Sequence, residues 1–113
     1  DGGYYLGKIM HSPKYPLEPP DFMLLTPSGR FEINRKICMT NSAFHSDEWS
    51  PSWNISGILI GFVSIMTSDK DSGIAHIKLS TEERKLLAAN SISYNRENYP
   101  EILSKFRRLV PKI

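Results

Sequence analysis

Residues 2–31 read GGYYLGKIMHSPKYPLEPPDFMLLTPSGRF and contain short strand-like segments separated by loop signals. Residues 4–10 predict a strand, although both of its faces carry apolar residues and the alternation is imperfect. A second strand is predicted over residues 22–25, and the turn signal Pro27-Ser28-Gly29 separates it from a short third strand at 30–33. We therefore expect three antiparallel strands in this half of the chain.

A proline-rich loop joins the first two predicted strands. Four prolines fall within eight residues of the segment 13–20. Proline fixes φ and removes a backbone donor, so this segment is expected to be a rigid extended loop rather than a strand or a helix. A long irregular stretch is predicted later, over residues 34–54, and such stretches in a compact domain are often functional.

The second half of the chain is predicted to be helical. Residues 55–66 are almost entirely apolar, which favours a buried helix. The segment 80–83, STEE, is a capping box in which the first hydroxyl accepts from the third helical N–H, and the helix that it starts should run to about residue 94. Pro100 fits the first turn of a third helix, whose apolar stripe reaches Val110. Strands followed by helices indicate an α+β fold.

The composition limits the class of protein. A chain of 113 residues fits one domain, since domains cluster at roughly 100–150 residues. A net charge of +2, with no basic run beyond Arg107-Arg108, argues against nucleic acid as a partner. The most apolar segment, at 55–66, is shorter than the roughly 20 residues that span a membrane. The chain begins without Met or a signal peptide, so we expect a piece of something longer.

Cys38 is the strong nucleophile candidate. As the single cysteine, it excludes an intrachain disulfide and a cysteine-rich zinc site, and it is compatible with a reducing compartment. Arg35 and Lys36 just before it could favour the thiolate. The alternative is a small buried hydrophobe, because free cysteine is among the most buried residue types.

A Cys-His-Asp relay is conceivable but weakly supported. His45 and Asp47 lie seven and nine residues after Cys38, whereas such residues meet in space rather than in sequence. A surface-loop histidine is the simpler interpretation of His45, and the other two histidines, His11 and His76, have no partner pattern. No metal-ligand spacing exists, so neither a metal nor a cofactor is expected.

Four motifs occur in the order found in ubiquitin-conjugating enzymes. Residues 15–20, YPLEPP, resemble the YPxxPP loop of that family, and residues 2–5, GGYY, resemble the GGYF strand start that precedes it. Cys38 falls where the catalytic cysteine is expected, and residues 49–52, WSPS, with the apolar helix after them, resemble the WSPA segment. Each motif alone is weak, but together they are specific and cover nearly the whole chain.

Two details resemble the divergent, tail-anchored J class, which is linked to endoplasmic-reticulum-associated degradation. Most members of the family carry His-Pro-Asn before the cysteine, whereas the J class has TPNGRF and this chain has TPSGRF at residues 26–31. Ser28 thus replaces the asparagine, ten residues before Cys38. The second detail is Phe44-His45, within a longer insertion between Cys38 and Trp49.

The resemblance implies a UBC-like fold, an antiparallel β-meander followed by helices, here without the N-terminal helix and the first strand. It implies one partial catalytic core domain over residues 1–113. It also implies that an activating enzyme passes ubiquitin to Cys38 as a thioester, and that a substrate lysine, or in the J class a hydroxyl, attacks it. The serine at position 28 reaches less far than asparagine, so either another group substitutes or transfer is slower. His45 is the leading substitute or general base.

Partner surfaces follow from the same resemblance. Leu17 stands where many members contact a RING-type ligase, and Pro51 and Ser52 match the second contact loop. The family often places a residue that orients the incoming lysine in the loop after the apolar helix. The candidates in this loop are Asp69, Asp71 and Ser72. The expected partners are ubiquitin, its activating enzyme, a ligase and a substrate protein, without nucleic acid or membrane contact by this segment. We expect a cytosolic location, with the full-length protein anchored by its tail on the endoplasmic reticulum.

Two other functions remain open. An inactive ubiquitin-binding variant of the same fold would lack the cysteine, so Cys38 argues against it, while Ser28 and the missing N-terminal elements keep it possible. A Cys-His hydrolase has only Cys38, His45 and Asp47 in its favour.

Overall fold

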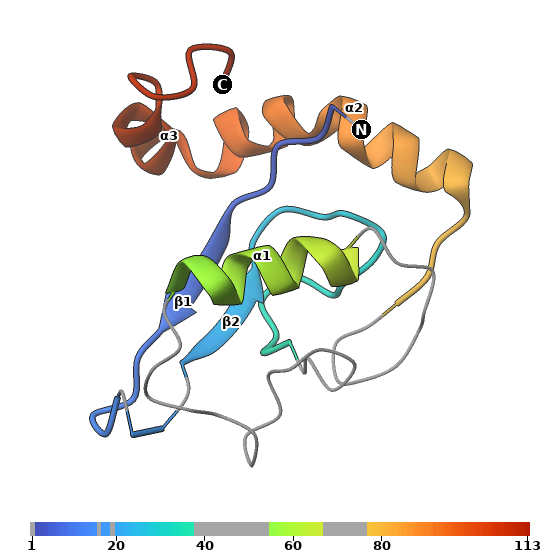
Figure 1. Ribbon diagram of the computed structural model, residues 1–113. Helices are drawn as coiled ribbons and strands as arrows, with labels where there is room; N and C mark the ends of the chain where they lie inside the picture. The colour runs from blue at the N-terminus through green and yellow to red at the C-terminus, as the bar shows by residue number, and fades with distance from the viewer. Residues whose placement is uncertain (1, 16, 19, 38–54, 67–76) are drawn as a thin grey trace.

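The computed structural model describes residues 2–15, 17, 18, 20–37, 55–66 and 77–113. Within these ranges two strands precede three helices along the chain, as Figure 1 shows. The elements are β1 (Gly7–Met10), β2 (Asp21–Leu24), α1 (Ile55–Met66), α2 (Thr81–Asn98) and α3 (Pro100–Phe106). This order confirms the predicted α+β class.

The sheet consists of one antiparallel pair in the described part of the chain. Gly7 lies opposite Leu24, and Met10 opposite Asp21. The predicted third strand at 30–33 is wrong, because Ile33 forms only an isolated parallel bridge with Leu24. Gly29 and Asn34 both have positive φ, of 76° and 58°. These two left-handed residues turn the chain at both ends of the segment 30–33.

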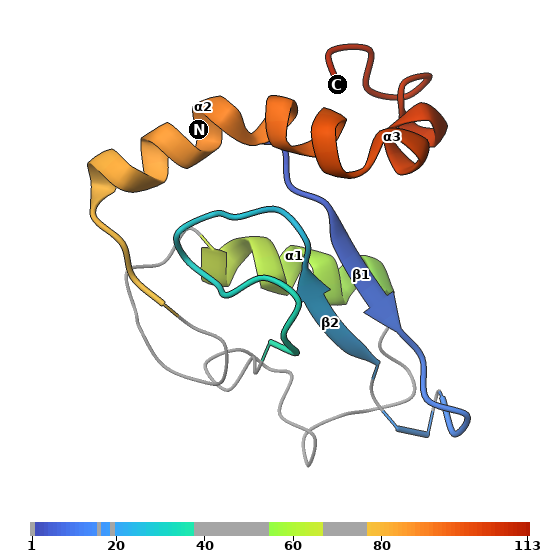
Figure 2. The same ribbon diagram turned by 180° about the vertical axis from the view of Figure 1, so that it is seen from behind.

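Helix α1 lies across the two strands and completes the core. Figures 1 and 2 show it spanning one face of the sheet. Ile58 and Phe62 are buried on this side of the helix, and the Phe62 ring lies 4.4 Å from that of Phe22 and 5.2 Å from that of Phe31, centroid to centroid. Such tilted aromatic pairs add to the stabilisation from apolar burial.

The prediction that the helix 55–66 is buried holds for one side only. The opposite side of α1 is exposed and carries large apolar residues, namely Leu59, Ile60 and Val63. The reason is geometric: a sheet covers one side of a helix, and no second described layer covers the other.

Helix α2 begins as predicted and ends later. The Ser80 hydroxyl accepts from the Glu83 N–H at 3.1 Å, which confirms this half of the capping box. The helix continues past the expected end near residue 94 to Asn98. It ends where Tyr99 precedes Pro100, because the residue before a proline is disfavoured in helical conformation.

Helix α3 is shorter than its apolar stripe suggests. It ends at Phe106, and two turn hydrogen bonds follow, from the Leu109 and Val110 N–H groups to the Phe106 carbonyl, at 2.9 and 2.8 Å. Of the stripe, Leu103 is buried, while Phe106 and Leu109 are exposed. Pro111 restricts only Val110, the residue before it, so it does not by itself explain why the helix ends at Phe106.

The proline-rich loop is turned rather than extended in its described part. The Tyr15 N–H donates to the Ser12 carbonyl at 3.0 Å, and the Leu17 N–H donates to the Lys14 carbonyl at 2.8 Å. Pro13 occupies the second position of the first turn, which its fixed φ favours. The expectation of an extended loop is therefore wrong for these residues.

A buried polar network ties α2 to the beginning of the chain. The Tyr4 N–H donates to Ser91 Oγ at 2.9 Å, and Asn95 Nδ2 donates to the Tyr4 carbonyl at 2.9 Å. Thr26 Oγ1 donates to Asn95 Oδ1 at 2.5 Å and accepts from the Leu6 N–H at 2.9 Å. Helix α2 is therefore held against both the N-terminal segment and the turn after β2.

Candidate functional site

Most of the predicted site residues lie outside the described part of the chain. These are Cys38, His45, Asp47, Pro51, Ser52, Asp69, Asp71 and Ser72. Two predicted site residues, Leu17 and Ser28, are described. The structure therefore describes the segment that leads to Cys38 and the predicted ligase contact at Leu17.

The segment that leads to Cys38 is fixed against the core. Ile37 is buried, and its N–H donates to the Phe22 carbonyl at 2.8 Å. The Asn34 N–H donates to the Leu24 carbonyl at 2.8 Å, and the positive φ of Asn34 turns the chain between the two bonds. Asparagine tolerates this conformation better than most residues. The residue before the predicted nucleophile is thus anchored to β2.

Ser28 is a buried brace for its own turn. Its side chain is 3% exposed, and its hydroxyl oxygen accepts from the N–H groups of Arg30, at 3.2 Å, and Phe31, at 3.4 Å. Serine commonly closes a turn in this way. The next residue, Gly29, has φ of 76°, and a Cβ there would lie 2.8 Å from Arg84 Cγ. Glycine is required at this position for both reasons.

Leu17 projects from the loop between the two strands. It is 76% exposed. Glu18 beside it accepts from the Ser12 hydroxyl at 2.9 Å and lies 3.7 Å from the Lys14 ammonium. These contacts hold the turn from which the leucine extends, although each is too exposed to contribute much stability. A large apolar side chain in this setting is available to a partner.

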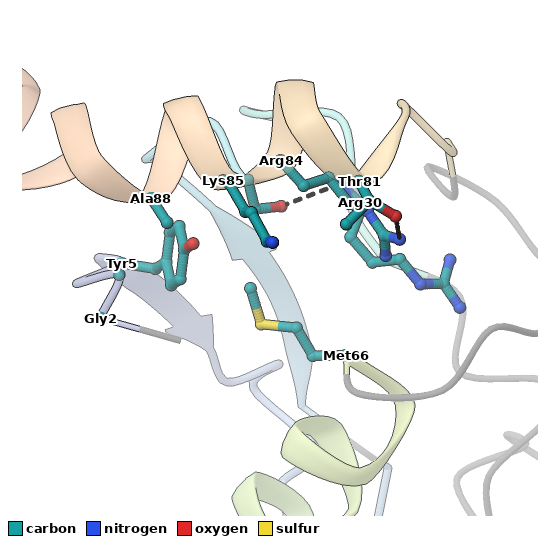
Figure 3. A pocket seen from close by; sticks show the side chains of 10 residues that line it. Gly2, Tyr5, Arg30, Met66, Thr81, Arg84, Lys85 and Ala88 are labelled. Atoms are coloured by element: carbon teal, nitrogen blue, oxygen red, sulfur yellow. Dashed lines mark hydrogen bonds between the residues drawn. The ribbon is translucent and has the colours of Figure 1, made fainter.

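A cavity of about 330 Å³ lies between the start of α2, the end of α1 and the N-terminal segment, as Figure 3 shows. Its lining includes three basic side chains, Arg30, Arg84 and Lys85. Tyr5 and Met66 supply apolar surface. Burial raises the pKa of the Tyr5 phenol, so the ring is neutral at physiological pH.

Sequence reasoning missed this cavity. From the sequence, Arg84 and Lys85 look like ordinary solvated residues of a helix, and Arg30 looks like part of a short strand. Arg30 is only 2% exposed, and its guanidinium carbon lies 5.3 Å from the centre of the Phe31 ring. The sequence offered one signal for the cavity: two basic residues lie three and four positions after Thr81, at the start of a helix.

The described residues contain no cluster of histidine, cysteine, aspartate or glutamate able to hold a metal ion. None of the helices described is long and apolar enough to cross a bilayer.

The chain is similar to several named proteins across most of its length. It is 40% identical over 98 residues to ubiquitin-conjugating enzyme E2 J2-like of Dictyostelium discoideum, a match that covers 87% of this chain and 57% of that protein. It is 39% identical over 112 residues to ubiquitin-conjugating enzyme E2 6 of Schizosaccharomyces pombe, covering 99% of this chain and 49% of that protein. The mouse ubiquitin-conjugating enzyme E2 J2 is 34% identical over 114 residues, covering 96% and 44%.

The chain spans about half the length of these curated relatives. No protein-family model matches it.

Proposed function

The chain belongs to the ubiquitin-conjugating enzyme family, and from this premise we propose that it is a ubiquitin transferase whose Cys38 carries ubiquitin as a thioester. The single observation that carries the proposal is the 39% identity over 99% of the chain to a ubiquitin-conjugating enzyme. An activating enzyme would supply the ubiquitin. We propose that residues 1–113 act as one partial catalytic core domain.

In the proposed transfer step, an acceptor on the substrate protein attacks the thioester carbonyl. A lysine amine is the expected acceptor, and a hydroxyl is the second. The attack places negative charge on the carbonyl oxygen, and one positioned donor is worth about 2.7–4 kcal/mol in hydrolase sites. Ser28 is buried, and its oxygen already accepts two N–H groups. We therefore assign Ser28 to bracing the turn before Cys38 rather than to contacting the oxyanion.

His45 is our proposed general base. A histidine near neutral pH can take the proton that an attacking hydroxyl must lose, and hydroxyl acceptors need this help more than amines do. We expect His45→Gln to slow discharge to hydroxyl acceptors, and unchanged discharge to both serine and lysine would refute the role. Orientation of the incoming lysine is proposed for one of Asp69, Asp71 and Ser72.

A RING-type ligase is the proposed partner at Leu17, together with Pro51 and Ser52. The exposure of Leu17 on a braced turn supports this part of the proposal. The proposed location is the cytosolic side of the endoplasmic reticulum membrane, with anchoring by a tail in the full-length protein.

The test is a charging assay on the full-length protein with activating enzyme, ATP and ubiquitin, analysed on a non-reducing gel. We expect a band shifted by one ubiquitin that reductant removes. Cys38→Ala should abolish the band, and Cys38→Ser should replace it with an oxyester that resists reductant. A folded protein that forms no adduct would contradict the proposal and favour an inactive ubiquitin-binding variant.

A further inference from the structure

Three basic residues line the cavity of Figure 3. Arg84 and Lys85 come from the first turns of α2, and Arg30 comes from the turn after β2. No carboxylate is among the described residues that line the cavity. Two glutamates, Glu82 and Glu83, lie in the first turn of α2 but not in this lining. The described lining therefore carries positive charge, which suits an anion.

Arg84 has unused hydrogen-bonding capacity. Its Nη2 donates to Thr81 Oγ1 at 3.5 Å, a long and weak bond. Its Nε is buried and has no hydrogen-bond partner among the described atoms. A buried donor without a partner is costly. The Nε and Nη2 edge of a guanidinium binds two oxygens of one phosphate side by side, so a phosphate on Thr81 would satisfy it once the Arg84 side chain rotates to expose this edge.

Thr81 is placed to carry that phosphate. It is exposed, it is the first residue of α2, and it lines the same cavity. Arg84 and Lys85 follow it by three and four residues, so all three share one side of the helix. Figure 3 shows Thr81, Arg84 and Arg30 gathered at one end of the cavity, with Lys85 reaching toward it from α2.

We propose that Thr81 is a phosphorylation site whose phosphate is held by Arg84, Lys85 and Arg30. A protein kinase would transfer the γ-phosphoryl group of ATP to the threonine hydroxyl. The Oγ1–P bond forms, the bond from the γ-phosphorus to the β–γ bridging oxygen breaks, the hydroxyl proton is lost to solvent, and ADP leaves. A phosphate at this position also lies near the positive end of the helix dipole.

The neighbouring Ser80 is a poorer acceptor. Its hydroxyl caps the helix by accepting from the Glu83 N–H, and it does not line the cavity. Phosphate on Thr81 would instead join α2 to the turn that contains Ser28 and Arg30. That connection already includes hydrogen bonds from the Ile77 and Leu79 N–H groups to the carbonyls of Arg30 and Gly29, each at 3.0 Å. Phosphorylation is therefore expected to tighten the structure that leads toward Cys38.

The first experiment installs phosphothreonine at position 81 of the full protein by genetic-code expansion and follows the phosphorus-31 resonance against pH. A phosphate held by three cations should have a second pKa about one unit or more below that of the phosphorylated peptide LSTEER. Arg84→Gln should bring the pKa back toward the peptide value. Arg96→Gln removes the same charge at the far end of α2 and should leave the pKa unchanged. A pKa equal to that of the peptide, or one insensitive to Arg84→Gln, would overturn the proposed contacts.

The second experiment asks whether the modification occurs. The protein is isolated from its native cells with phosphatase inhibitors, and the tryptic peptide of residues 79–84 is fragmented in a mass spectrometer. Phosphate on Thr81 supports the proposal. Phosphate confined to Ser80, or none on this peptide, would overturn it. Neither experiment depends on ubiquitin transfer, so its result is separate from that of the charging assay.

Discussion

At the scale of single residues, neighbours limit what a side chain can do. Ser28 carries a hydroxyl that could stabilise an oxyanion, but its oxygen accepts two backbone N–H groups and almost no solvent reaches it. Leu17 is the opposite case, an apolar side chain that contacts little of its own protein. The first residue is suited to holding a turn, and the second to binding a partner.

Leu17→Ala should lower ligase-stimulated discharge of ubiquitin from Cys38 about fivefold, because it removes one apolar contact of a transient interface. Discharge without ligase should not change. Leu109→Ala is a matched control, since Leu109 is 79% exposed and lies at the other end of the chain. Single-turnover discharge with and without a RING-type ligase measures the effect. Equal stimulated rates for the wild type and Leu17→Ala would exclude Leu17 from the ligase surface.

At the scale of elements, local signals determined where helices begin more reliably than where they end. Helix α2 starts at its capping box, but its end depends on Pro100 rather than on hydrophobic periodicity. In α3 the apolar pattern continues past Phe106, where the helix ends and the chain goes on in hydrogen-bonded turns. Periodicity reports which side chains favour burial, and backbone restrictions decide how far the helix extends.

Ser80→Ala should lower the free energy of unfolding by about 1 kcal/mol, because the N–H of Glu83 loses its side-chain acceptor. Ser93→Ala, in the exposed middle of α2, is the matched control and should change stability by less than about 0.5 kcal/mol. Urea unfolding followed by circular dichroism provides both values. Equal effects of the two substitutions would show that the cap contributes nothing specific.

At the scale of the whole molecule, a polar network joins segments that are distant in sequence. Asn95 on α2 donates to the Tyr4 carbonyl and accepts from Thr26, whose side chain is 0% exposed. Ser91 receives the Tyr4 N–H. These bonds compensate for burying polar groups that would otherwise be costly, and they fix how α2 lies against the N-terminal segment and the turn after β2.

Asn95→Ala should lower the free energy of unfolding by about 2 kcal/mol, because the Tyr4 carbonyl and the Thr26 hydroxyl would both lose a buried partner. Asn98→Ala on the same helix removes only an exposed bond to the Tyr94 carbonyl and should have a much smaller effect. Chemical denaturation compares the two, and hydrogen exchange at the Leu6 amide should accelerate in Asn95→Ala alone. A loss no larger than that of Asn98→Ala would mean that the network is not important for stability.

The predicted site could be compared with the structure only in part. The motifs at 15–20 and 26–31 indicated which positions of the family Leu17 and Ser28 match. They did not indicate that Leu17 is exposed and Ser28 buried. Cys38 and the predicted site residues within 45–52 and 69–72 lie outside the described ranges, so their roles stay predictions. The cavity lined by basic residues could not be predicted from the sequence, because it combines two residues of α2 with Arg30 from a distant turn.

The sequence by itself determined the order of strands and helices, the start of α2 and the family. These follow from local features: alternation, a capping box, prolines, and motifs read in order. Only the tertiary structure decided that the third predicted strand is a single bridge, that α1 buries one side, and that Thr26, Ser91 and Asn95 meet around Tyr4. The physical reason is that burial and hydrogen-bond pairing depend on segments far apart in the chain, which local pattern does not record.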